Sequence, residues 1–204
     1  PNQFKQIDIL INNAGNAHGL DPIQAGNYED WDAMLDINVK GLLYVSKEII
    51  PQFIERKQGH IINIGSTAGK EVYPNGNVYC ASKHAVDAIN QGMRIDLNQH
   101  NIRVGAIHPG LVETEFSEVR FKGDIEKAAK YYEEAAKFDD DAELYRKAGS
   151  LLLQSQNYSA AVVRLNKAIE LGSDKKGTIY SDLAEAYYYQ EKYKQAYNAI
   201  TKAM

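Results

Sequence analysis

The sequence predicts a partial α/β fold over residues 1–122, with a parallel sheet of three strands and flanking helices, followed by an all-α segment of repeated helical hairpins over residues 123–204. Before Gly123, short apolar runs alternate with longer amphipathic stretches; after it, a 35-residue period appears. The composition changes at the same place. All five prolines and all five histidines precede Gly123, whereas ten of the fourteen tyrosines follow it.

The first segment alternates predicted strands with predicted helices, as parallel sheets do. The expected elements are a strand at 7–12, a helix at 27–57 in two pieces, a strand at 60–65, a helix at 76–100 and a strand at 102–107. Asn27 is the expected N-cap of the first helix. Pro51 is expected to bend that helix or to begin a turn in it.

The second segment repeats itself. Four residues recur 35 positions later, because Tyr145, Tyr158, Ala161 and Ala168 match Tyr180, Tyr193, Ala196 and Ala203. Ala128, Tyr132 and Ala135 fit the second helix of one earlier unit. Residues 123–204 therefore resemble about two and a half tetratricopeptide repeats. This resemblance implies an interaction module whose concave face binds a peptide or protein partner.

Bulk composition argues against several classes of protein. With 23 basic and 27 acidic residues the net charge is −4, so a nucleic-acid partner is not expected. The apolar runs are too short to cross a membrane, and we expect a cytoplasmic protein. Cys80 is the only cysteine, and no Cys or His cluster has metal-ligand spacing, so no metal site is expected.

Four features of the first segment predict a chemical site. Asn12-Asn13-Ala14-Gly15 and Ser66 each follow a predicted strand, Asn38 lies within a predicted helix, and Tyr79 precedes Lys83 by four residues on another helix. Residues four apart share one helical face, so the Tyr79 hydroxyl and the Lys83 ammonium can lie in one pocket. Ligands bind at the carboxyl ends of parallel strands, where Ser66 is expected. Taken alone, each feature could equally be a turn or a packed core residue.

These motifs carry a resemblance to the short-chain dehydrogenase/reductase family over residues 1–122. They are NNAG at 12–15, DINVKG around Asn38, NIGSTAG around Ser66, YCASK at 79–83 and HPGLVETEF from His108. The resemblance implies a Rossmann-like sheet and an NADP- or NAD-dependent oxidoreductase. Within the family, GNVYCASK and PGLVETEFSEVRFKGD are most similar to NADP-dependent 3-hydroxy acid (serine-type) dehydrogenases.

The resemblance implies a role for each residue of the constellation. Tyr79 would be the general acid for carbonyl reduction and the general base for alcohol oxidation. Lys83 would lower the pKa of Tyr79 and hold the nicotinamide ribose. Ser66 would hydrogen-bond the substrate oxygen, and Asn38 would hold a water of a proton relay. The implied cofactor-binding residues are Asn12, Ala14, Gly15, Tyr79, Lys83, Pro109, Gly110, Val112 and Thr114.

The family places the cofactor pyrophosphate on a glycine-rich turn that no stretch of this sequence matches. That region also contains the determinant of NAD or NADP preference, so the sequence leaves this choice open. We therefore expect a catalytic-core fragment joined to a repeat fragment, with weak or no NADP binding. Two functions remain. The first is an oxidoreductase that acts on a small alcohol or carbonyl compound and that would be a homo-oligomer if complete. The second is a protein-interaction module.

Overall fold

The computed structural model describes residues 6–110 and 116–204, which form two compact units. The first unit ends at Arg120 and the second begins at Phe121. The boundary predicted from the sequence, between residues 122 and 123, lies two residues beyond this division. No described helix is both long enough and apolar enough to cross a membrane.

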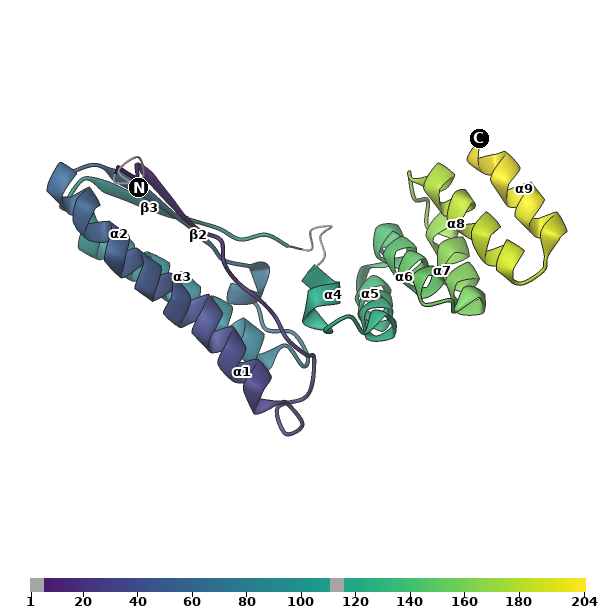
Figure 1. Cartoon of the computed structure of the whole chain (residues 1–204), viewed down its shortest axis with the longest axis horizontal. Coiled ribbons are helices and arrows are strands. Elements are labelled where there is room, and N and C mark those ends of the chain that lie inside the picture. Colours follow the sequence, from purple (N-terminus) through teal and green to yellow (C-terminus); the bar gives the residue numbers. More distant parts are fainter. Residues whose placement is uncertain (1–5, 111–115) are drawn as a thin grey trace. The chain divides into compact units, whose positions relative to one another are not determined.

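The first unit is built on a sheet of three parallel strands in the order β1-β2-β3 (Figure 1). The strands are β1 (Ile9–Asn12), β2 (Gly59–Ile64) and β3 (Ile102–Ile107). In register, Asn12 pairs with Asn63 and Ile64 pairs with Ile107, so the carboxyl ends of all three strands lie at one edge of the sheet. The prediction of a three-stranded parallel sheet is confirmed.

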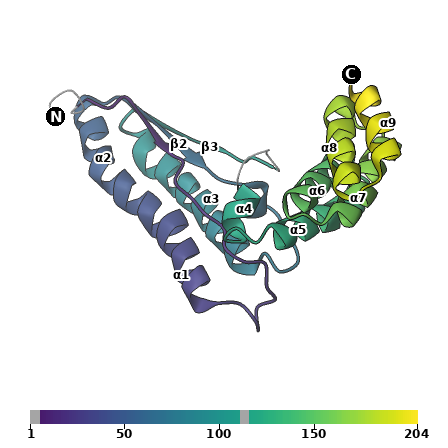
Figure 2. The ribbon, with the colours of Figure 1, turned by 45° about the vertical axis from the view of Figure 1, so that its right-hand side comes forward.

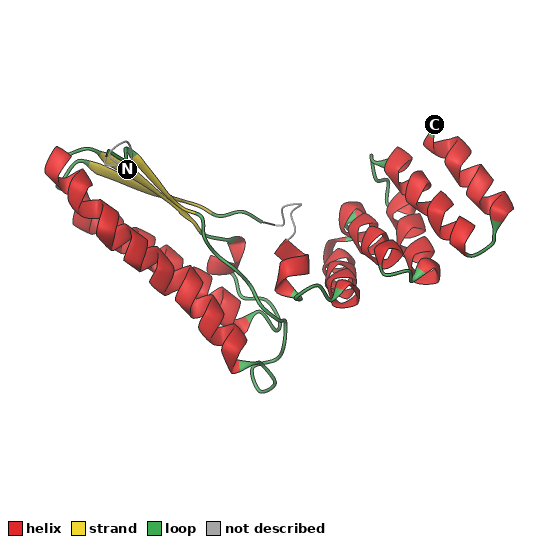
Figure 3. Ribbon diagram, viewed as in Figure 1, coloured by secondary structure: helices red, strands yellow, loops and turns green. Residues whose placement is uncertain are grey.

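Helices connect these strands, and one more helix follows the last strand (Figure 3). They are α1 (Tyr28–Leu35), the π-helical η2 (Asp36–Gly41), α2 (Leu42–Arg56), the 3-10 turn η3 (Thr67–Gly69), α3 (Asn77–Asn98) and α4 (Phe116–Arg120). The predicted cap is confirmed, since the Asn27 side chain accepts hydrogen bonds from the backbone amides of Glu29 and Asp30. A turn at Pro51, one of the two outcomes expected there, is not formed, because α2 continues through this exposed proline. The helical stretch changes to π geometry earlier, at η2.

One face of the sheet carries the core of the first unit. Helices α2 and α3 lie along this face (Figure 2), and Phe53, Ile61 and Val86 are completely or almost completely buried between the layers. Ile9 and Ile11 alternate with core-facing residues and are exposed. The side chains of a parallel strand point alternately to the two faces, and within the described residues the helices lie on one of them.

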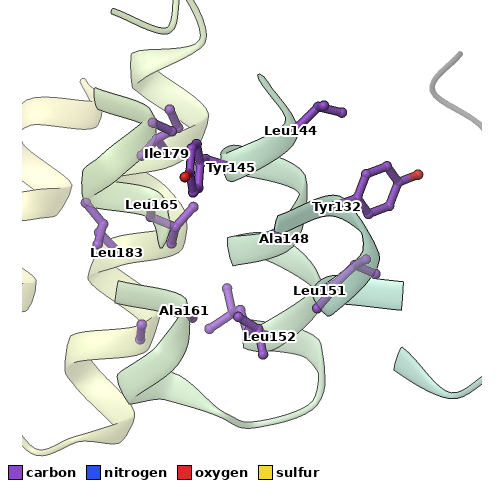
Figure 4. Packing of buried hydrophobic residues seen from close by; sticks show 14 of the residues in the cluster. Tyr132, Leu144, Tyr145, Ala148, Leu151, Leu152, Ala161, Leu165, Ile179 and Leu183 are labelled. Carbon is purple, nitrogen blue, oxygen red and sulfur yellow. The ribbon is translucent and has the colours of Figure 1, made fainter. Parts of the chain in front are cut away.

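The second unit consists of consecutive helices that pack on one another. They are α5 (Ile125–Asp139), α6 (Ala142–Gln154), α7 (Tyr158–Glu170), α8 (Lys176–Tyr189) and α9 (Tyr193–Ala203). The predicted helical character of this segment is confirmed. Figure 4 shows Tyr145, Leu165 and Ile179 gathered where α6, α7 and α8 meet, and all three belong to one buried cluster.

Gly149 allows α6 and α7 to pack at close range. A Cβ atom at this position would lie 2.6 Å from Leu165 Cγ, and Leu165 is fully buried. Interior side chains are close-packed and have little room to move away. The α6–α7 contact therefore depends on the absence of a side chain at Gly149.

We expect Gly149→Ala to lower the free energy of unfolding of the second unit by about 1–3 kcal/mol, because the added methyl group overpacks the interface. In an open helix the same change would stabilise by about 1 kcal/mol. Urea unfolding followed by far-UV circular dichroism measures the difference. Gly177→Ala is the control, since its Cβ would meet Ala203 O at an ordinary 3.5 Å. An unchanged or higher stability of Gly149→Ala would contradict the overpacking.

Candidate active site

Buried amide side chains tie the strand ends to the helices. Asn12 Nδ2 donates hydrogen bonds to Asn63 Oδ1 at 2.8 Å and to Ser46 Oγ at 3.0 Å. Asn63 Nδ2 in turn donates to Asn90 Oδ1 at 3.0 Å. This network links β1, β2, α2 and α3 through groups that are satisfied inside the protein. Both amide protons of Asn12 are used in it, so its side chain positions the strand ends.

The loop that follows β1 is held by Asn38. Asn13, Ala14 and Gly15 are exposed, and the backbone N–H of Asn16 donates to Asn38 Oδ1 at 2.8 Å. Asn38 Nδ2 donates to Asn16 O at 2.9 Å and to Ser82 Oγ at 3.0 Å. The buried Asn38 amide thus joins the loop to α3 from within the π turn. Both of its protons are used, so a water molecule could be held only through an oxygen atom of Asn38.

Tyr79 and Lys83 lie one turn apart on α3 and both are buried. Lys83 Nζ donates to Ile64 O at 3.2 Å, at the end of β2, and lies 5.9 Å from the centroid of the Tyr79 ring. Burial lowers the pKa of Lys83, because it penalises the charged ammonium. A Cβ atom on Gly15 would lie 3.4 Å from Lys83 Nζ, so the exposed loop passes directly beside this cation.

Ser66 lies where β2 gives way to η3. Its Oγ accepts a hydrogen bond from the Ala68 backbone amide at 3.1 Å, which fixes the side chain at the start of the turn. Gly69 packs so closely on α3 that a Cβ atom would lie 2.7 Å from Lys83 O. Ser66 is therefore anchored to a turn that lies directly against the helix carrying Tyr79 and Lys83.

The segment after β3 runs beside this turn. Thr67 N donates to Pro109 O at 3.0 Å, and Gly110 is exposed. Of the predicted cofactor-binding residues, Val112 and Thr114 lie outside the described residues. The others, from Asn12 to Gly110, lie on or just after the carboxyl ends of the strands or on the α3 face beside them.

Sequence reasoning missed Arg120 as a member of this site. Its side chain is buried, donates from Nε to Gly19 O at 2.9 Å and from Nη1 to Tyr73 OH at 3.0 Å, and lies 5.5 Å from the Tyr79 ring centroid. Arg120 and Tyr79 both line a small hollow, together with Trp31 and Asp30. The sequence offers no signal for this role, because these partners lie far from Arg120 along the chain.

The arrangement can transfer a proton. A phenol and an ammonium group lie on one helix face at the strand ends, which is where α/β sheets bind ligands. Among the described residues, no group of three His, Cys, Asp or Glu side chains could hold a metal ion.

Comparison with known proteins identifies the family. The family model for short chain dehydrogenases matches residues 1–124. The chain belongs to the short chain dehydrogenase family. The similarity therefore covers the first unit, which contains Ser66, Tyr79 and Lys83.

Individual relatives in this family are dehydrogenases. The NADP-dependent 3-hydroxy acid dehydrogenase of Salmonella typhi is 53% identical over 134 residues, which cover 65% of this chain and 54% of the relative. The enzyme of the same description in Schizosaccharomyces pombe is 42% identical over 132 residues, covering 65% of this chain and 51% of the relative. A closed form of serine dehydrogenase complexed with NADP+ superposes with a TM-score of 0.62 at 50% identity, over 65% of this chain and 54% of that one. The chain spans about half the length of these relatives.

The pKa of Lys83 predicts a pH dependence of stability. Folding lowers this pKa. At pH values between the lowered pKa and about 10.4, the unfolded chain therefore carries a proton on Lys83 and the folded chain does not. The free energy of unfolding of the wild type should therefore rise with pH relative to Lys83→Met, by at most about 1.4 kcal/mol per pH unit. Urea unfolding followed by fluorescence of Trp31, the only tryptophan, reports on the first unit. A stability difference that is constant with pH would contradict the prediction.

Proposed function

We propose that this chain supplies the proton-transfer site of an NADP-dependent oxidoreductase that interconverts a small alcohol, specifically a 3-hydroxy acid, and its carbonyl compound. The observation that carries the proposal is the pair of buried side chains Tyr79 and Lys83, one turn apart at the carboxyl end of β2. The substrate class and the cofactor follow from relatives described as NADP-dependent 3-hydroxy acid dehydrogenases.

In this proposal the Tyr79 hydroxyl gives a proton to the carbonyl oxygen in reduction and takes it back in oxidation. A free phenol has a pKa of about 10, which is too high for a base at neutral pH. The Lys83 ammonium, 5.9 Å from the ring centroid, favours the phenolate by its charge. Ser66, held at the start of η3, would hydrogen-bond the same substrate oxygen and keep it within reach of Tyr79.

The residues around Lys83 fit the nicotinamide-ribose end of NADP, which when bound supplies or accepts the hydride. A lysine ammonium has three donors, and among the described residues its hydrogen bond to Ile64 O uses one. A ribose hydroxyl would offer an acceptor for another. The exposed loop with Gly15 beside Lys83 leaves room for a ligand to approach the backbone. For the pyrophosphate, the sequence contains no glycine-rich turn of the family type.

Replacing Tyr79 with phenylalanine tests the proposal. We expect Tyr79→Phe to lower kcat/KM for NADP+-dependent oxidation of a 3-hydroxy acid by about 10²–10⁴-fold, because the proton acceptor is lost while the ring remains. NADPH absorbance measures the rate. Tyr44→Phe, an exposed position on α2, is the matched control and should leave the rate unchanged. Turnover in Tyr79→Phe equal to that of the wild type would contradict the proposal.

A second function is supported by the helical unit. Its helices pack pairwise in sequence order, and residues 35 apart occupy matching places: Leu144 and Ile179 are both buried, as are Ala148 and Leu183. This periodicity in both sequence and burial favours a helical-repeat module of the tetratricopeptide type that binds a peptide or protein partner. Tyr79→Phe should not affect such binding.

A further inference from the structure

The buried side chain of Arg120 lies beside the ring of Tyr79. Its guanidinium carbon, Cζ, is 5.5 Å from the centroid of that ring, and Lys83 Nζ is 5.9 Å from the same centroid. Arg120 and Lys83 are both more than nine-tenths buried. Charges interact more strongly inside a protein than in water, because the surroundings screen them less. Tyr79 therefore has two buried basic side chains beside it, one from α3 and one from α4.

The contacts of Arg120 hold its charge in this place. Its Nε donates to Gly19 O at 2.9 Å, and its backbone oxygen accepts from Gly19 N at 3.1 Å. Its Nη1 donates to Tyr73 OH at 3.0 Å, and Cζ lies 5.7 Å from the Tyr73 ring centroid. Phe116, also on α4, contacts the Tyr79 ring with centroids 5.8 Å apart. Helix α4 is therefore joined both to the loop after β1 and to Tyr79, and these contacts fix the guanidinium.

The two basic groups differ in how they titrate. Burial lowers the pKa of Lys83, so its ammonium loses the proton at a lower pH than that of a free lysine. An arginine guanidinium stays charged at every pH at which proteins are folded. A phenol has an ordinary pKa of about 10, so it ionises in the alkaline range. In that range the charge of Arg120 persists after that of Lys83 is lost.

Other groups near Tyr79 disfavour its ionised form. The small hollow that Tyr79 and Arg120 share is also lined by His18, Asp21 and Asp30. The two carboxylates disfavour a phenolate by their charge, and a neutral His18 ring adds no charge. Burial of Tyr79 disfavours the phenolate as well. Among these described lining groups, Arg120 is the one whose positive charge opposes both effects at every pH.

We propose that Arg120 is the second cation of the proton-transfer site, whose permanent charge beside the Tyr79 ring favours the phenolate that accepts the proton of the alcohol. In oxidation the Tyr79 oxygen takes the hydroxyl proton of the substrate, and in reduction it returns that proton to the carbonyl oxygen. Arg120 keeps its own protons throughout. The inference rests on the proposed function, in which the accompanying hydride passes to or from NADP, and it adds a group that the set of Ser66, Tyr79 and Lys83 does not include.

Ionisation of Tyr79 can be measured directly. Difluorotyrosine is introduced at position 79 alone, where the fluorine atoms lower the pH of ionisation toward neutrality, and fluorine NMR records the titration midpoint. We expect Arg120→Gln to raise this midpoint by about 1 pH unit, because a nearby opposite charge favours the ionised form. Arg120→Lys keeps a cation and should have a midpoint close to that of the wild type.

A merely structural role of Arg120 predicts a different result. Loss of its contacts with Gly19 and Tyr73 would expose Tyr79 to water, which favours the ionised phenol and lowers the midpoint. An unchanged or lower midpoint in Arg120→Gln would therefore overturn the proposal. A rise in Arg120→Lys as large as that in Arg120→Gln would overturn it too, because the charge would then not be what matters.

Arg94→Gln is the matched control, because Arg94 is an exposed arginine on the same helix as Tyr79. It removes the same charge and should leave the midpoint unchanged, because solvent and salt screen exposed charges. Circular dichroism checks that each variant keeps its helix content through the titration. The titration needs neither NADP nor substrate, so an unraised midpoint overturns the role of Arg120 alone, whereas the turnover of Tyr79→Phe decides the proposed function.

Discussion

The burial of the Lys83 ammonium at the carboxyl end of β2 is the constraint on which the site depends. A buried charge is costly unless it is hydrogen-bonded, and Ile64 O provides that bond because β2 ends beside α3. The close approach requires Gly69, whose missing side chain lets η3 lie against the backbone of Lys83. Once Lys83 is fixed, Tyr79 on the same face and Ser66 on the adjoining turn are fixed as well. The catalytic proposal is therefore a consequence of how α3 packs on the strand ends.

The two units reach stability by different means. In the first, buried amides such as Asn12, Asn38 and Asn63 bind loops and strands with hydrogen bonds that have definite directions. Such networks favour one arrangement of the polar groups, as a reaction site requires. In the second, small residues such as Gly149 and Ala148 let helices pack closely on one another. Packing of this kind repeats from helix to helix along the second unit.

Much of this fold could be predicted from local sequence. The strand predicted at 102–107 and the observed strand β3 have the same first and last residues, and Asn27 caps α1 as predicted. Both predictions succeed because strand burial and capping depend on residues close in sequence. The proximity of Tyr79 and Lys83 also follows from helix geometry alone. The π turn around Asn38 could not be foreseen, since its amide is held by Asn16 and Ser82 from other segments. Arg120 was missed for the same reason: Gly19, Tyr73 and Tyr79 are its neighbours only in the folded chain.

The central claim is that Tyr79 and Lys83 act as one unit in proton transfer. A double-mutant cycle on kcat/KM, with Tyr79→Phe, Lys83→Met and the double variant, measures their coupling most directly. If Lys83 acts through the phenol, its replacement should matter little once the hydroxyl is gone, and the double variant should be no slower than the slower single variant. If instead the two losses multiply, Tyr79 and Lys83 act independently, and the claim that they form one unit is contradicted.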